Sequence, residues 1–136
     1  MSKKMVSFFA IVTLLFICCS GVYASVTPYS QYLIQDMSSR VDSSSSGNLL
    51  ISGSTFTFFT VDEVKVTVYL QRWNGSSWVD VGSGITNTSY NQRLAITSAE
   101  RFVTKNEFYR TRSIHVAKIG GSTETKYFYS SAYYHQ

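Results

Sequence analysis

The side chains that carry catalytic chemistry in enzymes are few and scattered in this sequence. Its two histidines are His115, in a strand-like stretch, and His135, next to the C-terminus. A lone strand histidine is more typical of a packed or surface residue than of a general base. Asp62 and Glu63 are adjacent, so in a strand they point to opposite faces, which suits neither paired-carboxylate catalysis nor a calcium site. No serine lies in a nucleophile elbow. We therefore expect no catalytic residue, no metal and no cofactor, and hence no enzyme.

Aromatic side chains offer a different chemistry, the stacking of rings on a ligand. Glu63 to Trp73 alternates between apolar and polar residues, which predicts a half-buried strand. Asn74-Gly75 then predicts a hairpin turn that leads into Trp78 to Val81. A turn of two or of four residues gives the same two faces. The buried face holds Val64, Val66, Val68, Leu70, Val79 and Val81. The opposite face holds Tyr69, Trp73 and Trp78.

A second hairpin is predicted from Glu107–Ile119 and Thr125–Tyr134, joined around Gly120-Gly121. With a turn of two or four residues, one face holds Phe108, Arg110, Arg112, Ile114, Tyr127, Tyr129 and Tyr133. The other face holds Tyr109, Thr111, Ser113, His115, Ala117, Ile119, Phe128 and Ala132, although a three-residue loop would reverse the assignment. The arginines indicate that the first face is exposed, with tyrosine rings able to stack on the guanidinium groups.

The rest of the chain also favours strands. Ser, Thr, Tyr, Phe and Val dominate, and no periodicity of 3.6 residues is present. Asn48–Thr60 reads as one long strand or two short ones broken near Gly53, Arg93–Thr97 as a further strand, and Ser38–Gly47 as a flexible loop. Turns recur at the spacing of an antiparallel sandwich. We predict an all-β, antiparallel, immunoglobulin-like β-sandwich of about seven strands over residues 25–136.

The N-terminus predicts export. Lys3 and Lys4 precede the apolar stretch Met5–Cys19, and Val22-Tyr23-Ala24 places small residues where signal peptidase cleaves. The apolar stretch is shorter than the roughly 20 residues of a membrane span. We therefore expect residues 1–24 to be a signal peptide, the only part that meets a membrane, and the protein to be secreted, either free or associated with the cell surface.

The predicted cleavage also removes both cysteines, Cys18 and Cys19, so no disulfide is expected in the remaining chain. Net charge falls from +4 to +2, divided as −2 over residues 25–92 and +4 over residues 93–136. This density of charge is far below that of a nucleic-acid binder, so nucleic acid is not an expected partner.

Two stretches carry a resemblance to a known family. VYLQRWNGSSWVDVG (Val68–Gly82) and FYRTRSIHVAKIGGSTETKYFYSSAYY (Phe108–Tyr134) resemble an uncharacterised family of small secreted, immunoglobulin-like proteins of Gram-positive bacteria. Relatives tend to have a glycine just before the Tyr-Arg pair, where this chain has Asn106 and Glu107. Asn106 is able to adopt the left-handed conformation that a turn requires there. The resemblance implies the sandwich fold and supplies no catalytic residue.

In immunoglobulin-like sandwiches the two predicted hairpins belong to one sheet. One outer face then carries the candidate ligand-binding residues Tyr69, Trp73, Trp78, Arg110, Arg112, Tyr127 and Tyr129. A solvent-exposed strand surface without function explains such residues too. The functional interpretation is a non-enzymatic binding module that recognises cell-envelope or other polysaccharide, or another secreted protein.

The alternative is a structural, self-assembling surface protein, since the aromatic segment Tyr127–Tyr134 is expected at a sheet edge, where strands recruit other chains. The sequence leaves the oligomeric state open.

Overall fold

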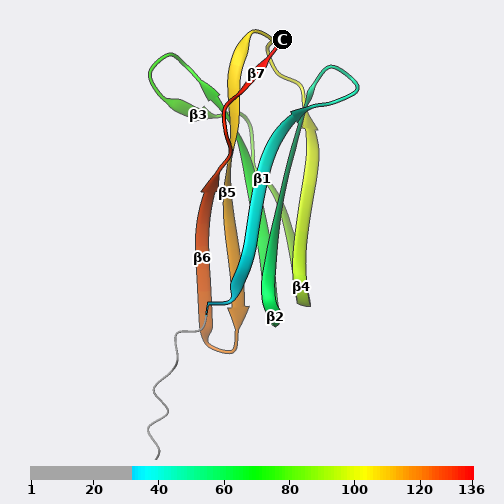
Figure 1. The fold of residues 1–136 in the computed structure, drawn as a ribbon, viewed down its shortest axis with the longest axis vertical. Coiled ribbons are helices and arrows are strands. Elements are labelled where there is room, and N and C mark those ends of the chain that lie inside the picture. Colours follow the sequence, from blue (N-terminus) through cyan, green and yellow to red (C-terminus); the bar gives the residue numbers. More distant parts are fainter. Residues whose placement is uncertain (1–31) are drawn as a thin grey trace, which may run out of the picture. The chain divides into compact units, whose positions relative to one another are not determined.

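A computed structural model describes residues 32–136, which form seven antiparallel β-strands (Figure 1). The strands are β1 (Ile34–Ser43), β2 (Leu49–Trp73), β3 (Trp78–Asp80), β4 (Ile85–Arg101), β5 (Glu107–Ile119), β6 (Ser122–Tyr129) and β7 (Tyr133–His135). The predicted all-β, antiparallel class is therefore confirmed. The predicted signal peptide lies outside the described residues. Within the described part of the chain, no helix has the length and apolar character of a membrane crossing.

Strand β2 is central to the sheet, because different sections of it pair with different neighbouring strands. Its first half pairs with β1 on one edge and with the end of β4 on the other. Its second half pairs with the start of β4 and with β5. The register of the β2–β4 pair shifts between Phe56 and Val61, and there β2 turns back along the molecule (Figure 1). The sheet thereby curls and packs the two halves of β2 against each other.

Gly53 lies at the contact between those halves. A side chain at this position would place its Cβ 2.5 Å from Val68 Cγ2 and 3.1 Å from the carbonyl oxygen of Ser38. Of the two alternatives for Asn48–Thr60, one long strand is therefore present, and the alternative with a break near Gly53 is wrong. The glycine lies within the strand and allows the close approach, while the irregularity lies further on, at residues 57–60.

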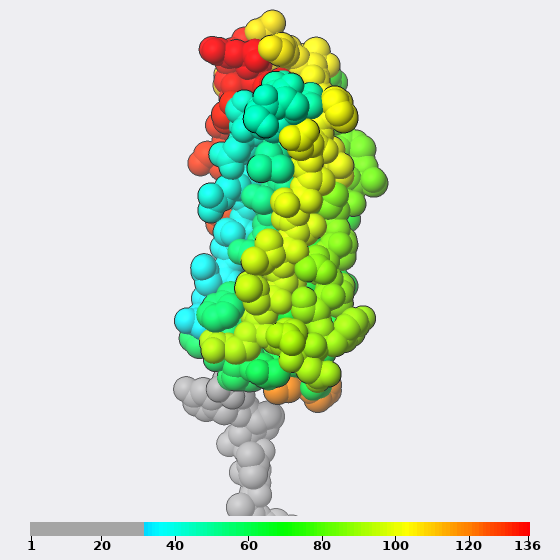
Figure 2. Space-filling view, turned by 90° about the vertical axis from the view of Figure 1, so that its right-hand side faces the viewer, coloured from blue at the N-terminus to red at the C-terminus, as the bar shows by residue number. Residues whose placement is uncertain are grey.

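Strands β1 and β4 are held in the curled sheet by different contacts. At the start of β1, the backbone N–H groups of Leu33 and Ile34 donate to Glu124 Oε2 of β6, at 2.6 and 2.7 Å. Within residues 32–136, strand β4 pairs with β2 alone, and Figure 2 shows β4 along one side of the molecule. β1 and much of β4 were not predicted as strands. Ser38–Ser43 pairs with β2 instead of forming part of a flexible loop.

Buried residues alternate with more exposed ones along the second half of β2, as predicted for the first hairpin. Val64, Val66, Val68 and Leu70 are buried, and Val81 packs against them from the segment after β3. Tyr109 is also buried, and its hydroxyl donates to the carbonyl oxygen of Thr104 at 2.8 Å. This bond fixes the corner between β4 and β5, where Asn106 has a φ of 62°. The left-handed conformation expected at Asn106 is thus present.

Part of the interior is polar and hydrogen-bonded. His115 is fully buried, with Nδ1 2.7 Å from Thr55 Oγ1 and Nε2 2.7 Å from Ser113 Oγ. Ser113 Oγ also bonds Ser39 Oγ at 3.0 Å, and Ser39 Oγ bonds Thr111 Oγ1 at 2.8 Å. Burial lowers the pKa of His115 to about 4, so the ring is neutral near pH 7. The five residues form one inner hydrogen-bond chain.

The second hairpin has a two-residue turn, with Ile119 paired to Ser122. The predicted faces hold for β5 and β6, but Tyr133 is on the wrong one. Strand β6 ends at Tyr129, and β7 then pairs separately with the start of β5, with Tyr133 opposite the buried Tyr109. The break at residues 130–132 changes the alternation, so Tyr133 packs against the core and Tyr134 faces outward.

Candidate binding surface

One face of the sheet brings together aromatic rings, two arginines and their polar partners. We call it the aromatic–arginine face, and it consists of Tyr69, Gln71, Trp73, Trp78, Asp80, Arg110, Arg112 and Tyr129. These side chains meet because of strand register. Tyr69 lies opposite Arg112, and Arg112 lies opposite Tyr129 on its other side.

The register of this face depends on the loop at residues 74–77. Asn74 Oδ1 accepts hydrogen bonds from the backbone N–H groups of Ser76 and Ser77, at 3.0 and 2.8 Å. Gly75 has a φ of +100°, a conformation that favours glycine. The resulting four-residue loop pairs Trp73 with Trp78, and their ring centroids are 5.5 Å apart with an angle of 56° between the ring planes. This is one of the two turn lengths that the sequence left open.

Arg110 is held between two rings. Its guanidinium carbon lies 4.6 Å from the centroid of Trp78 and 4.7 Å from the centroid of Tyr129. Its Nε donates to Gln71 Oε1 at 2.9 Å, which fixes the plane of the group. Arg110 therefore aligns two aromatic side chains that lie far apart in the sequence.

The positive charge of Arg112 is balanced by a counterion within the face. It donates to Asp80 Oδ2 at 2.9 Å and lies 4.2 Å from the ring centroid of Tyr69. The other oxygen of Asp80 accepts a hydrogen bond from Gln71 Nε2 at 2.8 Å. Burial alone would raise the pKa of Asp80, but the bonds from Arg112 and Gln71 lower it below its ordinary value. The bond to Asp80 in turn raises the pKa of Arg112, so both groups keep their charge near pH 7.

The predicted residues differ in how much of each side chain is exposed to solvent. Tyr69 is partly covered, since its ring lies against Gly84 as well as Arg112. Trp73 and Trp78 are half-buried. Tyr129 is 49% exposed, and Tyr127, opposite Ile114, is 60% exposed and lies next along the same side of β6. Four predicted aromatic residues thus contact one another or the predicted Arg110 and Arg112, while Tyr127 lies beside them.

The candidate residues chosen from the sequence leave out four others on this side of the sheet, although Phe108 was assigned to the correct face. Gln71 lies two residues after Tyr69, and Asp80 lies two residues after Trp78. The alternation of side chains along a strand could therefore have placed both on this face. Phe108 and Tyr134 form an exposed aromatic pair, with centroids 4.9 Å apart. No sequence signal placed Tyr134 there, because its face depends on the break after Tyr129.

Residues 22–132, which include both hairpins, match the family of unknown function DUF6147. The chain belongs to DUF6147. The match includes all residues of the aromatic–arginine face and ends before Tyr134. No curated protein and no solved structure matches the chain.

The chemistry that this DUF6147 chain offers at the face is stacking and hydrogen bonding. The rings of Trp78 and Tyr129 are held by Arg110, and the ring of Trp73 lies against Trp78. All three rings are partly open to solvent. Across residues 32–136, no group of three His, Cys, Asp or Glu is placed to hold a metal ion. His115 belongs to the inner hydrogen-bond chain, on the other side of β5 from the arginines.

Proposed function

We propose that the protein is a secreted, non-enzymatic binding module that recognises cell-envelope polysaccharide through the aromatic–arginine face. The observation that carries the proposal is the guanidinium group of Arg110, held between the rings of Trp78 and Tyr129. Rings fixed before binding lose little conformational freedom when a ligand stacks on them. The adjacent Trp73–Trp78 pair extends this preorganised aromatic surface.

The state of the arginines favours stacking over ion pairing. Arg112 already has Asp80 as its counterion, and Arg110 Nε already has Gln71 as its acceptor. Their charges therefore stabilise the rings more than they attract an anionic ligand. This supports neutral sugar units as the preferred ligands, with the exposed ring of Tyr127 adding contact area further along β6.

We also propose that the curled sheet is an immunoglobulin-like sandwich. The order of pairing supports this fold: β1, the first half of β2 and the second half of β4 form one layer. The second half of β2, the first half of β4, β5 and β6 form the other. The Tyr109–Thr104 bond adds support, because a tyrosine that bonds the backbone a few residues upstream recurs at a corner of such sandwiches.

Export is part of the same proposal. The support is the order of the basic pair Lys3-Lys4, the apolar stretch to Cys19 and the small residues before Ser25. The resemblance to secreted proteins of Gram-positive bacteria agrees with that order. N-terminal sequencing of material from the culture medium is expected to begin at Ser25, and a chain retained in the membrane with an intact Met1 would contradict export.

A double variant, Trp73→Ala with Trp78→Ala, tests the binding face. We expect the variant to fold and to lose retention on purified Gram-positive cell-wall polysaccharide, measured by pull-down. The matched control, Phe58→Ala with Tyr90→Ala, removes two exposed aromatic side chains elsewhere and is expected to bind like the wild type. A folded tryptophan variant with full retention would contradict the proposed face.

Self-assembly is the second candidate function. It is favoured by the exposed rings of Tyr127 and Tyr129 on β6, which pairs with β5 alone in the described chain. Assembly through this strand predicts that particle size in light scattering grows with protein concentration, without any ligand. Tyr127→Lys is then expected to abolish that growth, and a constant size at all concentrations would exclude the candidate.

A further inference from the structure

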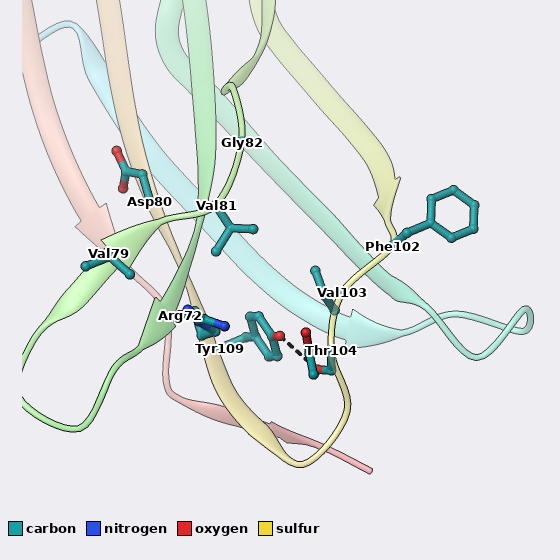
Figure 3. A pocket seen from close by; sticks show the side chains of 9 residues that line it. All are labelled: Arg72, Val79, Asp80, Val81, Gly82, Phe102, Val103, Thr104 and Tyr109. Carbon is teal, nitrogen blue, oxygen red and sulfur yellow. Dashed lines mark hydrogen bonds between the residues drawn. The ribbon is translucent and has the colours of Figure 1, made fainter.

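A pocket of about 400 Å³ opens on the inner side of the β2–β3 hairpin (Figure 3). Its walls combine apolar and polar groups: Val79, Val81 and Val103 supply apolar side chains, and Arg72, Asp80 and Thr104 supply polar ones. Its volume falls within the range of about 300–1,000 Å³ that is usual for small-molecule sites. The rings of the proposed stacking surface lie on the other side of the hairpin, and Asp80 is the one residue that the pocket shares with the aromatic–arginine face.

Arg72 brings a cationic group to this pocket. Its neighbours across the sheet are Val79 and Tyr109, so its side chain continues the inner face beyond Leu70. Its Nε is buried and has no hydrogen-bond partner. No ion pair of the described residues includes Arg72. A buried donor without an acceptor leaves the guanidinium group of Arg72 poorly satisfied, and an acceptor that reaches its terminal Nη groups would stabilise it.

The other polar groups of the pocket are already occupied. Asp80 accepts from Arg112 and Gln71, which balances its charge. The hydroxyl of Tyr109 donates to the carbonyl oxygen of Thr104, and Figure 3 shows this bond beside Arg72. Among these groups, Arg72 is therefore the one left to recognise a ligand by charge.

We propose that this pocket binds an organic carboxylate with an apolar body. The two terminal Nη groups of Arg72 present a pair of donors that matches the two oxygens of a carboxylate, while the buried Nε is closed to a ligand. The side chains of Val79, Val81 and Val103 supply the apolar contact for the rest of the ligand. The inference is independent of the proposed polysaccharide binding, which uses the opposite face.

Benzoate is a suitable probe because it combines a carboxylate with a compact apolar ring. In a titration of ¹⁵N-labelled protein followed by NMR, we expect saturable shifts at the amides of Gly82, Val103 and Tyr109. Benzyl alcohol, which keeps the ring and lacks the charge, is expected to bind at least tenfold more weakly. Equal binding of the two compounds, or the absence of saturable shifts at these amides, would overturn the proposal.

Substitution of Arg72 tests the cationic group directly. Arg72→Met keeps an apolar stem of similar length and is expected to raise the Kd for benzoate at least tenfold. Lys105→Gln removes a nearby charge that does not line the pocket, and we expect less than a twofold change. A tenfold loss in both variants would overturn the site by assigning the effect to net charge.

Arg72→Lys covers the case in which the methionine variant does not fold. It keeps the charge and removes the paired donors, so benzoate is expected to bind at least threefold more weakly, and unchanged affinity would overturn the paired-donor geometry. Benzoate binding is expected to survive in the Trp73→Ala, Trp78→Ala variant. Failure of one site can therefore be told from failure of the other.

Discussion

At the scale of single residues, the alternation of side chains along the strands was enough to identify the face. It was not enough to predict which side chains of that face contact one another. Tyr69, Trp73 and Trp78 face outward with either turn length that the sequence allows. With a two-residue turn, however, Gln71 would lie opposite Trp78. The four-residue loop places it opposite Asp80 instead and creates the link from Arg110 through Gln71 to Asp80. The choice is made by the side chain of Asn74, a local interaction that the hairpin signal does not specify.

Arg110→Lys tests whether the planar guanidinium organises the face. A lysine keeps the charge but loses the Nε bond to Gln71 and the flat group between the two rings. We expect the free energy of unfolding in urea to fall by about 1 kcal/mol, because cation–π contacts at partly exposed sites contribute about 0.5–1 kcal/mol each.

Polysaccharide retention of Arg110→Lys is expected to fall as well, since the rings lose their support. Arg40→Lys, on an exposed position of β1, is the matched control and is expected to change neither measurement. If Arg110→Lys is as stable and binds as well as the wild type, the guanidinium is a passive neighbour of the rings.

At the scale of elements, a strand was predictable where apolar side chains facing the core alternate with polar ones. Strands without that clear alternation were not predictable. The second half of β2 alternates strictly and was found. Strand β1 was missed because its inward positions include Ser39, which the inner hydrogen-bond chain satisfies. Only the stretch Arg93–Thr97 of β4 was predicted, because β4 is an edge strand with one buried residue, Ala95, and shows little alternation.

Gly53→Ala tests the close approach between the halves of β2. Its Cβ would lie 2.5 Å from Val68 Cγ2 and 3.1 Å from a backbone oxygen, so the strands must move apart. We expect a loss of about 1–3 kcal/mol in the free energy of unfolding, the usual cost of overpacking a core.

Gly121→Ala is the control for Gly53→Ala, because its added methyl group would meet no atom within 4 Å. Its effect is expected to be within about 0.5 kcal/mol. Adding Val68→Ala to Gly53→Ala is expected to recover part of the loss by removing the closest methyl groups. A Gly53→Ala protein as stable as the wild type would show that the two halves separate without cost.

At the scale of the whole molecule, the described chain is held by an apolar core and a polar interior side by side. The sequence predicted the apolar part from the valines of β2. It indicated a polar inner face on β5 but not how that face is satisfied, because Thr55, Ser113 and Ser39 come from three strands. Their hydrogen bonds centre on a neutral His115, which makes the stability of the fold sensitive to acid.

The direction of that sensitivity follows from the lowered pKa of His115. In the unfolded chain the ring titrates near 6.5, and in the folded protein at about 4. The unfolded state therefore binds the proton first, so stability is lost as the pH falls from about 6.5 to 4 and regained as it rises. At about 1.4 kcal/mol per pKa unit, the full loss is on the order of 3 kcal/mol.

Urea unfolding at a series of pH values measures this loss. The carboxylates with lowered pKa are Asp80, with an ordinary value of 3.8, and Glu100 and Glu124, with an ordinary value of 4.5, and they lose their stabilising effect mainly below pH 4.5. The window from pH 6.5 to 4.5 thus isolates the histidine. His115→Gln keeps hydrogen-bonding groups without a titrating ring, and we expect it to be less stable at pH 7 but nearly flat across that window. A wild-type protein that is equally flat there would mean that acid reaches His115 without opening the fold, and that the inner chain holds a charged ring as readily as a neutral one.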